Sequence, residues 1–283
     1  KGSANRASQI LANGLWRKNI NTNDMNDLLY GFTDEDGITH EGLSGNKLTK
    51  ASMEMLEKEI TDDEVKNVML HLPLGKSAGP DRIPNAVYKH LAEYLAPKLG
   101  DLLREAVTRG ALPSSFMEGD ITVLYKKEAR DDPRNYRPIT LLQNAYNIFT
   151  RILAQRMKLV LHDFVSEAQK GFVPHAFIAE CTMLMNLVET YINDDNRPER
   201  GRMMLFLDME KAFDRVSYEF LAKAMEAVGF GDRFRRTVHM MYNVNRPPQR
   251  RIYANGYYSE SVNGSQSNQE WHRDAPSALC SSS

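Results

Sequence analysis

Cysteine, long apolar runs and excess charge are all scarce in this sequence of 283 residues, which contains two cysteines, Cys181 and Cys280. So few cysteines exclude a disulfide framework or a cysteine-based zinc site, and they are typical of a reducing compartment. No apolar run approaches the roughly 18 residues that a membrane-spanning helix needs. The chain begins at Lys1, without a signal peptide. We therefore expect an intracellular location, the nucleus included, and no membrane partner.

The numbers of basic and acidic residues are nearly equal and do not indicate a function by themselves. The 36 basic and 37 acidic residues give a formal net charge of -1, so composition alone does not indicate a nucleic-acid partner. Hydrophobic residues make up 42% and charged residues 26%, which is ordinary for a globular protein. The length allows one large domain or two smaller ones with a sizeable core.

Capping chemistry and apolar periodicity predict more helices than strands. Thr61-Asp62-Asp63-Glu64 has the pattern of a capping box and predicts a helix that continues through Leu72. Further helices are predicted from apolar spacing across 84–109 (interrupted near Pro97), 141–162, 177–193 and Phe220 to Val228, with Gly229 ending the last one.

Two apolar runs predict strands. They are Ile121–Tyr125 and the continuous run Met203–Leu207, which has the composition of a buried strand. Residues 1–46 are polar and predict irregular structure. Helices and strands are mixed along the chain, so the predicted fold class is α+β and helix-rich.

A carboxylate follows the second predicted strand. Asp208 comes directly after the run Met203–Leu207, and a helix is predicted beyond it. An acid at such a point can present its oxygens to Mg²⁺, as polymerases require. Ending a strand or capping a helix is the simpler role for a lone Asp. Position alone leaves both roles open.

The string Phe206-Leu207-Asp208-Met209-Glu210-Lys211-Ala212-Phe213-Asp214 resembles the first catalytic motif of reverse transcriptases, particularly those of non-LTR (LINE-like) retrotransposons and group II introns. The resemblance implies that Asp208 is catalytic and binds both magnesium ions, with the carbonyl of Met209 beside it. Phe213 corresponds to the steric gate, a ring that excludes a 2′-hydroxyl and so selects dNTPs. Without the motif, Phe213 would be interpreted as a core residue.

The segment 124–158 is basic, with eight Lys or Arg residues against three acids. The basic residues are Lys126, Lys127, Arg130, Arg134, Arg137, Arg151, Arg156 and Lys158. Charge alone fits a phosphate-binding patch and a solvated face equally well. However, Ile121–Lys126 followed by Asn135–Leu142 resembles the fingers hairpin of the same enzymes. That resemblance assigns Lys126 and Arg137 to the incoming triphosphate, one as a point charge and one as a bidentate ligand.

Two loops extend the resemblance. Gln169-Lys170-Gly171-Phe172 is similar to the family's Gln-x-Gly-Phe segment, which helps to hold the template, and this assigns Gln169 and Gly171 to nucleic-acid binding. Gly75–Pro84 is similar to a segment just upstream of the fingers, and it is not a phosphate-binding P-loop, because Gly-x-x-x-x-Gly-Lys is absent. Two departures stand out: His175-Ala176 occupy the place of Gly-Arg, and Arg82 replaces a usual Gly.

A third basic stretch, residues 233–259, contains six arginines, several aromatic residues and no acid. Our hypothesis is that this stretch follows the backbone of the primer–template duplex, with Arg250 and Arg251 as nucleic-acid-binding residues. A surface helix with loosely placed arginines fits the same composition nearly as well.

The resemblance covers about 61 to 262. It implies right-hand polymerase fingers at 61–200 and a first, incomplete part of the palm at 201–262, after an N-terminal extension at 1–60. The family's Gln-Gly-Cys-Pro-Leu-Ser-Pro and Ala-Asp-Asp segments are not found. Codons that encode Gln269–Ser283, read two bases later, can encode Val-Ala-Gln-Gly-Cys-Pro-Leu-Ser-Pro. We infer a frame slip near Val262–Gly264 and expect 263–283 to be a disordered tail; a genuine low-complexity tail is the alternative.

The implied parent enzyme is an RNA-directed DNA polymerase that extends a DNA primer on an RNA template, using dNTPs and two Mg²⁺ ions. One metal-binding Asp without its two partner carboxylates cannot hold that pair of ions, so we expect this chain to be inactive. A non-catalytic nucleic-acid-binding remnant and a host-adopted scaffold are the alternatives.

Overall fold

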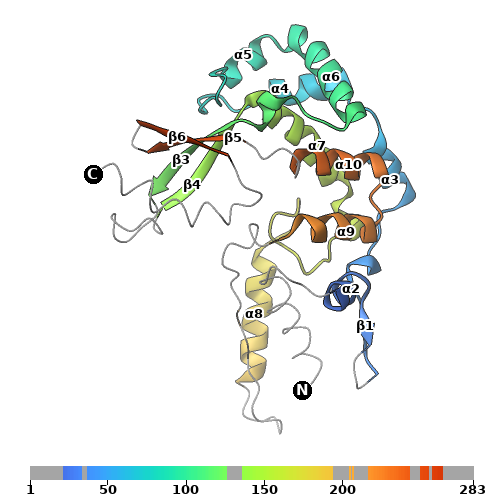
Figure 1. Ribbon diagram of the computed structural model, residues 1–283. Coiled ribbons are helices and arrows are strands. Elements are labelled where there is room, and N and C mark those ends of the chain that lie inside the picture. Colours follow the sequence, from blue (N-terminus) through green and yellow to red (C-terminus); the bar gives the residue numbers. More distant parts are fainter. Residues whose placement is uncertain are drawn as a thin grey trace.

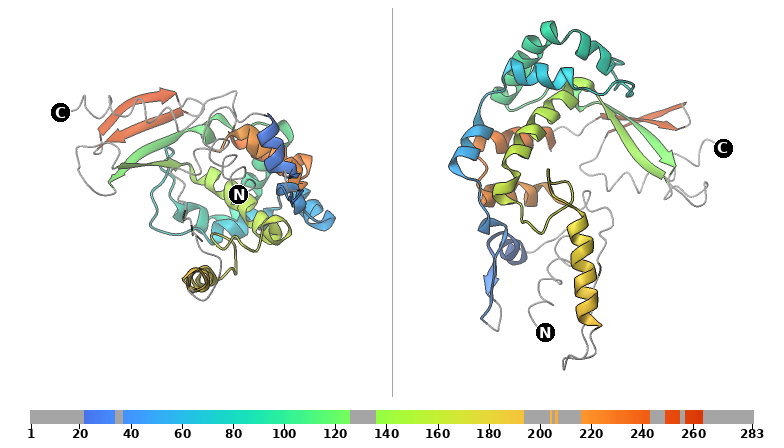
Figure 2. Two further views of the ribbon diagram at one scale, coloured as in Figure 1. Left: turned by 90° about the horizontal axis from the view of Figure 1, so that it is seen from below. Right: turned by 180° about the vertical axis from the view of Figure 1, so that it is seen from behind.

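The computed structural model describes residues 22–33, 37–125, 136–193, 204, 206, 216–242, 249–254 and 257–263. Stacked helices form the main body, a sheet extends from one side, and one helix stands away from the rest (Figure 1). The two further views in Figure 2 show the same separation of sheet and helices. Helices and strands are therefore mixed and helices predominate, as the sequence predicts.

The helices are α2 (Thr22–Tyr30), α3 (Lys50–Glu57), α4 (Asp62–Leu70), α5 (Asn85–His90), α6 (Ala92–Arg109), α7 (Asn144–Phe164), α8 (Ala179–Ile192), α9 (Tyr218–Val228) and α10 (Asp232–Tyr242), with short 3₁₀ turns η1 (Leu43–Gly45) and η2 (Ser114–Met117). The strands are β1 (Phe32–Thr33), β2 (Thr39–His40), β3 (Gly119–Tyr125), β4 (Tyr136–Leu142), β5 (Gln249–Ala254) and β6 (Tyr257–Asn263).

The main core lies where α4 packs on α6 and α7, and α10 packs on α3, α6 and α9. Its fully buried side chains include Val65, Leu103, Phe149 and Phe234. Burying a side chain of this size stabilises a fold by about 1.5–3 kcal/mol. Leu56 and Ile60 from before residue 61, and Met240 from beyond residue 200, belong to the same cluster. The domain boundaries drawn from the sequence remain predictions.

The capping box is confirmed. The hydroxyl of Thr61 accepts a hydrogen bond from the backbone N–H of Glu64, and the Glu64 carboxylate accepts one from the backbone N–H of Thr61. Together these bonds satisfy two of the donors that every helix start leaves open. Helix α4 begins as predicted and ends slightly early, at Leu70, with His71 as its C-cap.

The prediction of a helix break near Pro97 is wrong. Pro97 lies inside α6, and the break falls at Leu91, which ends α5 and precedes α6 with φ -103° and ψ 20°. Proline removes one helical hydrogen bond and disfavours the helix interior. Burial of Ala92, Ala96, Leu99 and Leu103 along α6 offsets that cost, because these residues hold the helix against the core.

The four-stranded sheet has the order β4-β3-β5-β6. β3 pairs with β4 in an antiparallel hairpin, and its other edge pairs with β5 in parallel. β5 and β6 are antiparallel, with an irregular register between Arg251 and Ile252. The predicted strand Ile121–Tyr125 is confirmed within β3.

The N-terminal part is more ordered than the sequence predicts. Residues 1–21 lie outside the described part, but α2 and the β1–β2 hairpin stand where we expected irregular structure. Met25 and Leu29 of α2 are buried with Ala227 of α9. These contacts are with a segment about 200 residues away, and local polarity does not reveal them.

The predicted buried strand Met203–Leu207 is mostly outside the described residues. Met204 and Phe206 are described, carry no strand assignment, and Phe206 is 65% exposed. At these two positions the prediction is wrong, because the described sheet is built from other strands.

Helix α8 is apolar but exposed. Within the described part of the chain, none of its residues is buried. Leu184, Leu187, Val188 and Tyr191 follow one another at helical spacing and are 61%, 68%, 36% and 43% exposed. Among the residues that the structure describes, no helix is long and apolar enough to cross a membrane.

Candidate nucleic-acid interface

The β3–β4 hairpin holds the predicted triphosphate-binding segment. Tyr125 pairs with Tyr136 in the last rung, and Leu124 pairs with Arg137. Lys126 lies outside the described residues. Its chain neighbour Tyr125 pairs with Tyr136, which directly precedes Arg137. The hairpin therefore joins the two halves of the basic motif, as the sequence predicts for this segment.

The predicted catalytic segment cannot be placed. Asp208, Met209 and Phe213 lie outside the described residues. Within the described ranges, no group of three or more His, Cys, Asp or Glu side chains could hold a metal ion. The assignments of these three residues remain predictions.

The sheet adds the two arginines of β5 to the hairpin. Arg250 is in register with Gly119 of β3, and Arg251 is in register with Asp120. Successive positions on a strand belong to opposite faces of a sheet. Arg137 is opposite Leu124, which lies four residues after Asp120 on β3, so Leu124 and Asp120 belong to the same face. The positions of Arg137 and Arg251 therefore share that face, and the position of Arg250 belongs to the other.

The loop 75–84 is fixed to the root of this hairpin. A Cβ on Gly79 would lie 2.5 Å from the carbonyl oxygen of Leu142, so only glycine allows this approach. The side-chain amide of Asn144 donates to the carbonyl of Ile83 at 2.7 Å, across the same junction. The loop thus lies beside the hairpin, at the point where β4 leads into α7.

Arg82 has an unusual backbone in this loop. Its φ is +60°, in the left-handed region that costs an L-residue about 1–2 kcal/mol and costs glycine nothing. Its guanidinium Nη2 lies 3.6 Å from Oδ2 of Asp120, whose side chain is 3% exposed. A glycine would adopt this backbone conformation without that cost, and here an arginine adopts it.

The predicted template loop precedes α8. The Gln169 amide donates to the carbonyl of Gly171 at 2.9 Å, forming a local turn in which Gln169 is exposed. Phe172 and His175 have φ values of +63° and +64°. His175 is the second position at which the resemblance expects glycine, so both departures from glycine fall on left-handed residues.

Lys170 and Glu180 link this loop to the first turn of α8 with an ion pair of 2.6 Å. The hydrogen bond to Glu180 raises the pKa of the Lys170 ammonium above its ordinary value. The loop is therefore fixed to α8, with Gln169 and Phe172 on the outside; Phe172 is 96% exposed.

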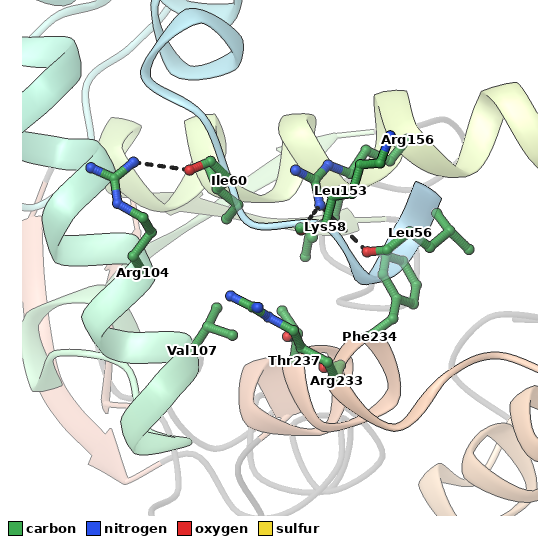
Figure 3. Close-up of a pocket in the computed structure, with 10 residues that line it drawn as sticks. All are labelled: Leu56, Lys58, Ile60, Arg104, Val107, Leu153, Arg156, Arg233, Phe234 and Thr237. Carbon is green, nitrogen blue, oxygen red and sulfur yellow. Dashed lines mark hydrogen bonds between the residues drawn. The ribbon is translucent and has the colours of Figure 1, made fainter. Parts of the chain in front are cut away.

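Arg156 does not belong to the basic patch, which corrects one interpretation of the segment 124–158. Its side chain is 7% exposed and forms a bidentate pair with Glu64, with both N–O distances at 2.7 Å. It also donates to the carbonyl of Leu56 in the last turn of α3 and to that of Lys58 just after it (Figure 3). A third carbonyl, that of Glu59, accepts from the same guanidinium. Its donors are thus occupied by the α3–α4 connector. Arg151 and Lys158, by contrast, are exposed on α7.

The capping-box carboxylate responds to this contact. Partial burial raises the pKa of Glu64, but the hydrogen bonds from Arg156 and Thr61 outweigh that effect and hold the pKa below its ordinary value. The charged form of Glu64 is therefore the one that the fold stabilises.

Three arginines surround a cavity beside the connector, but the cavity is too small for a nucleotide. Arg104, Arg156 and Arg233 line a space of about 20 Å³, roughly what one water requires (Figure 3). Arg104 donates to the carbonyl of Ile60 at 2.9 Å, and Arg233 pairs with Glu59 at 3.3 Å. These arginines stabilise the helix junction.

A larger cavity of about 530 Å³ lies between α9 and α10. Tyr218 and Tyr242 stand at it with their ring centroids 4.6 Å apart, and Leu221 and Met225 add apolar surface. Of its two arginines, Arg235 is paired with Glu226 at 3.5 Å and with Asp232, and Arg236 donates to the carbonyl of Asp232 at 3.3 Å. Arg235 and Arg236 belong to the basic stretch 233–259, but none of the individually assigned site residues lines this cavity.

Two residues beside the candidate interface were missed by sequence reasoning. Asp120 is buried at the base of β3, and Arg82 faces it from the loop. The replacement of a usual glycine by Arg82 was a visible signal, but the pairing with Asp120 was not, because it joins a loop and a strand that are 38 positions apart.

Comparison with known proteins finds a family whose match begins within the hairpin, at the last residue of β3. The family described as "Reverse transcriptase (RNA-dependent DNA polymerase)" matches residues 125–265. A protein of Xenopus laevis, "Transposon TX1 uncharacterized 149 kDa protein", is 31% identical over 189 residues, covering 67% of this chain and 14% of that protein.

Other relatives are similar in kind. A "Probable RNA-directed DNA polymerase from transposon BS" of Drosophila melanogaster is 28% identical over 182 residues, covering 61% of this chain and 19% of the relative. A "Retrovirus-related Pol polyprotein from type-1 retrotransposable element R2" of Popillia japonica is 28% identical over 151 residues, covering 48% and 20%. The chain therefore spans a fifth or less of the length of these relatives.

Proposed function

Because the chain belongs to the reverse transcriptase family, in the group found in non-LTR retrotransposons, we propose that it is part of an RNA-directed DNA polymerase. The parent enzyme extends a DNA primer on an RNA template with dNTPs. In this proposal residues 61–200 form the fingers and 201–262 the first part of the palm.

The observation that carries this proposal is the β3–β4 hairpin. Tyr125 and Tyr136 pair at its end, so the chain positions that follow them, 126 and 137, belong to one basic motif. We assign the incoming triphosphate to Lys126 and Arg137, and the sugar of the dNTP to Phe213. A charge-assisted bidentate contact from arginine to phosphate is about twice as strong as a neutral hydrogen bond.

The template and the primer–template duplex have separate contacts in the proposal. Gln169 and Gly171 hold the template at the turn before α8, where Gln169 is exposed. Arg251 contacts the duplex backbone, since its position shares a sheet face with that of Arg137. Arg250 stands at a position of the opposite face and contributes to a different part of the surface.

Reverse transcriptases generally use a divalent metal ion. We assign Mg²⁺ to Asp208 and the carbonyl of Met209, where the ion would stabilise charge on the transferred phosphoryl group. The described residues do not provide a set of three or more ligands by themselves. The printed polypeptide contains Asp208 but no Ala-Asp-Asp segment. We therefore propose that these 283 residues alone bind primer–template without extending it.

The first test measures binding and extension with the same polypeptide. Fluorescence anisotropy on an RNA–DNA hybrid with a recessed primer should give an affinity that falls linearly with the logarithm of salt concentration. Primer extension with dNTPs and Mg²⁺ should give no product. Incorporation that Asp208→Asn abolishes would overturn the proposed inactivity. No binding of the hybrid would overturn the proposed function and leave the scaffold hypothesis.

The second part of the test addresses the triphosphate. Arg137→Ala should raise the Kd for a fluorescent dATP analogue by roughly 10- to 100-fold, the loss expected for a charge-assisted contact. Arg151→Ala, an exposed arginine of α7, removes the same charge and should leave this Kd unchanged. Equal effects of the two variants would contradict a specific role for Arg137.

A further inference from the structure

The loop that carries Arg82 is a rigid part of the sheet region. Gly79 is buried against the backbone of Leu142, and the carbonyl of Ile83 accepts a hydrogen bond from Asn144. Within the loop, the backbone N–H of Arg82 donates to the carbonyl of Gly79 at 3.0 Å. Asp81 accepts from the backbone N–H of Ile83 at 3.1 Å. The conformation of residue 82 is therefore set by contacts on both sides of it.

This rigid turn places a charged side chain at the base of β3. The Arg82 side chain is 66% exposed, while the Asp120 carboxylate 3.6 Å away is 3% exposed. A buried carboxylate is costly unless a cation offsets its charge. Asp120 thus forms a long ion pair, without a hydrogen bond, with a guanidinium whose surface largely faces solvent. The left-handed backbone at φ +60° is a cost that a glycine would avoid.

The sheet register relates Arg82 to the proposed duplex contacts. Asp120 is in register with Arg251, and Leu124, four residues further along β3, is opposite Arg137. These positions share one face and extend over about 13 Å at roughly 3.3 Å per residue. A nucleic-acid strand advances about 3.4 Å per phosphate along the helix axis. This face is therefore long enough to follow several phosphates.

We propose that Arg82 is a nucleic-acid contact, in which its guanidinium, held by Asp120, binds a backbone phosphate of the primer–template duplex at the base of β3. The inference rests on the proposed function and adds a binding residue to it. The simpler role, a counter-ion for Asp120 with no ligand, makes different predictions for paired variants.

Arg82→Gly is the central variant, because glycine is compatible with φ +60° and removes the charge. It should weaken binding of the RNA–DNA hybrid roughly three- to tenfold. The slope of log K against log salt should become shallower by about 0.7–0.9, the value for one phosphate contact. Arg82→Lys, which keeps the charge, should retain most of the salt slope. Arg109→Ala, an exposed arginine paired with Glu105 on α6, controls for net charge and should change neither quantity.

A double variant separates binding from folding. Arg82→Gly with Asp120→Asn removes the buried charge together with its partner, so no uncompensated carboxylate remains. It should bind as weakly as Arg82→Gly while unfolding in urea at a concentration close to that of the unmodified chain. Hybrid affinity and salt slope equal to those of the unmodified chain would overturn the assignment. If the unmodified chain itself fails to bind, it is the proposed function that fails.

Discussion

The α3–α4 connector and helix α8 are opposite extremes of the same chain. At the end of α3 and in the connector, the backbone carbonyls of Leu56, Lys58 and Glu59 all accept hydrogen bonds from Arg156. In α8, within the described residues, no side chain is buried, although most of its sequence is apolar. A polar residue is thus at the centre of the fold, and an apolar helix is at its surface.

The difference shows that hydrophobicity alone does not identify what holds this chain together. Arg156 is buried because one guanidinium joins the carbonyls that follow α3 to the capping-box carboxylate of Glu64 in the first turn of α4. α8 has apolar residues at regular helical spacing, but no other described element packs closely along it (Figures 1 and 2). Substitutions at the connector should therefore lower the free energy of unfolding much more than substitutions in α8.

The largest expected effect is at Arg156. Arg156→Met keeps the apolar stem but leaves Glu64 and three connector carbonyls without this donor. Removing one partner of a buried ion pair costs about 3–5 kcal/mol, and we expect a loss of that size in the free energy of unfolding, measured in urea. Arg151→Met, on an exposed position of the same helix, should change it by less than about 0.5 kcal/mol. Similar losses in both variants would remove the special role of Arg156.

Two leucines, one in the core and one on α8, allow the same substitution to be compared at a buried and at an exposed position. Leu103 of α6 is 0% exposed and Leu187 of α8 is 68% exposed. Leu103→Ala should lower the free energy of unfolding by about 2–5 kcal/mol because it opens a cavity in the core. Leu187→Ala should change it by less than about 0.5 kcal/mol. A loss above about 2 kcal/mol for Leu187→Ala would mean that α8 is covered in solution.

The smallest expected effect is on pH dependence. The folded chain holds the pKa of Glu64 below its ordinary value, so its contribution to stability is fully present above the unfolded pKa near 4.3. That contribution is lost as the pH falls from there through the folded pKa. Glu64→Gln should therefore lower stability at pH 7 and flatten the decline between about pH 5 and 3, measured by urea unfolding. A decline as steep as that of the unmodified chain would show that other carboxylates are responsible.

Local features were predictable from the sequence and long-range ones were not. The capping box at Thr61 and the C-cap at Gly229, with φ +95°, follow from a few adjacent residues. The helix break was misplaced from Leu91 to Pro97, because burial along α6 outweighs the local preference of proline. For Arg156, the sequence shows a charge but not its partner Glu64, 92 residues away on α4.

The same distinction applies to the candidate interface. The β3–β4 hairpin was predicted from a motif in one short stretch, and the register confirms the pairing of its strands. The parallel pairing of β3 with β5 was not predicted, although it determines which arginine positions share a face. The role of Asp120 could not be predicted, because its pairing with Arg82 depends on a loop that is distant in the sequence.

The central place of β3 in the sheet also affects how the chain emerges from the ribosome. β4 follows β3 closely, but β5 begins at Gln249, more than 100 residues after β4 ends. At about 5–20 residues per second, synthesis of that interval takes roughly 5–20 seconds. During this time one edge of β3 lacks its native neighbour, and open strand edges invite pairing with other chains. The exposed edge of β3 is therefore the place where the nascent chain is most prone to pair with another chain.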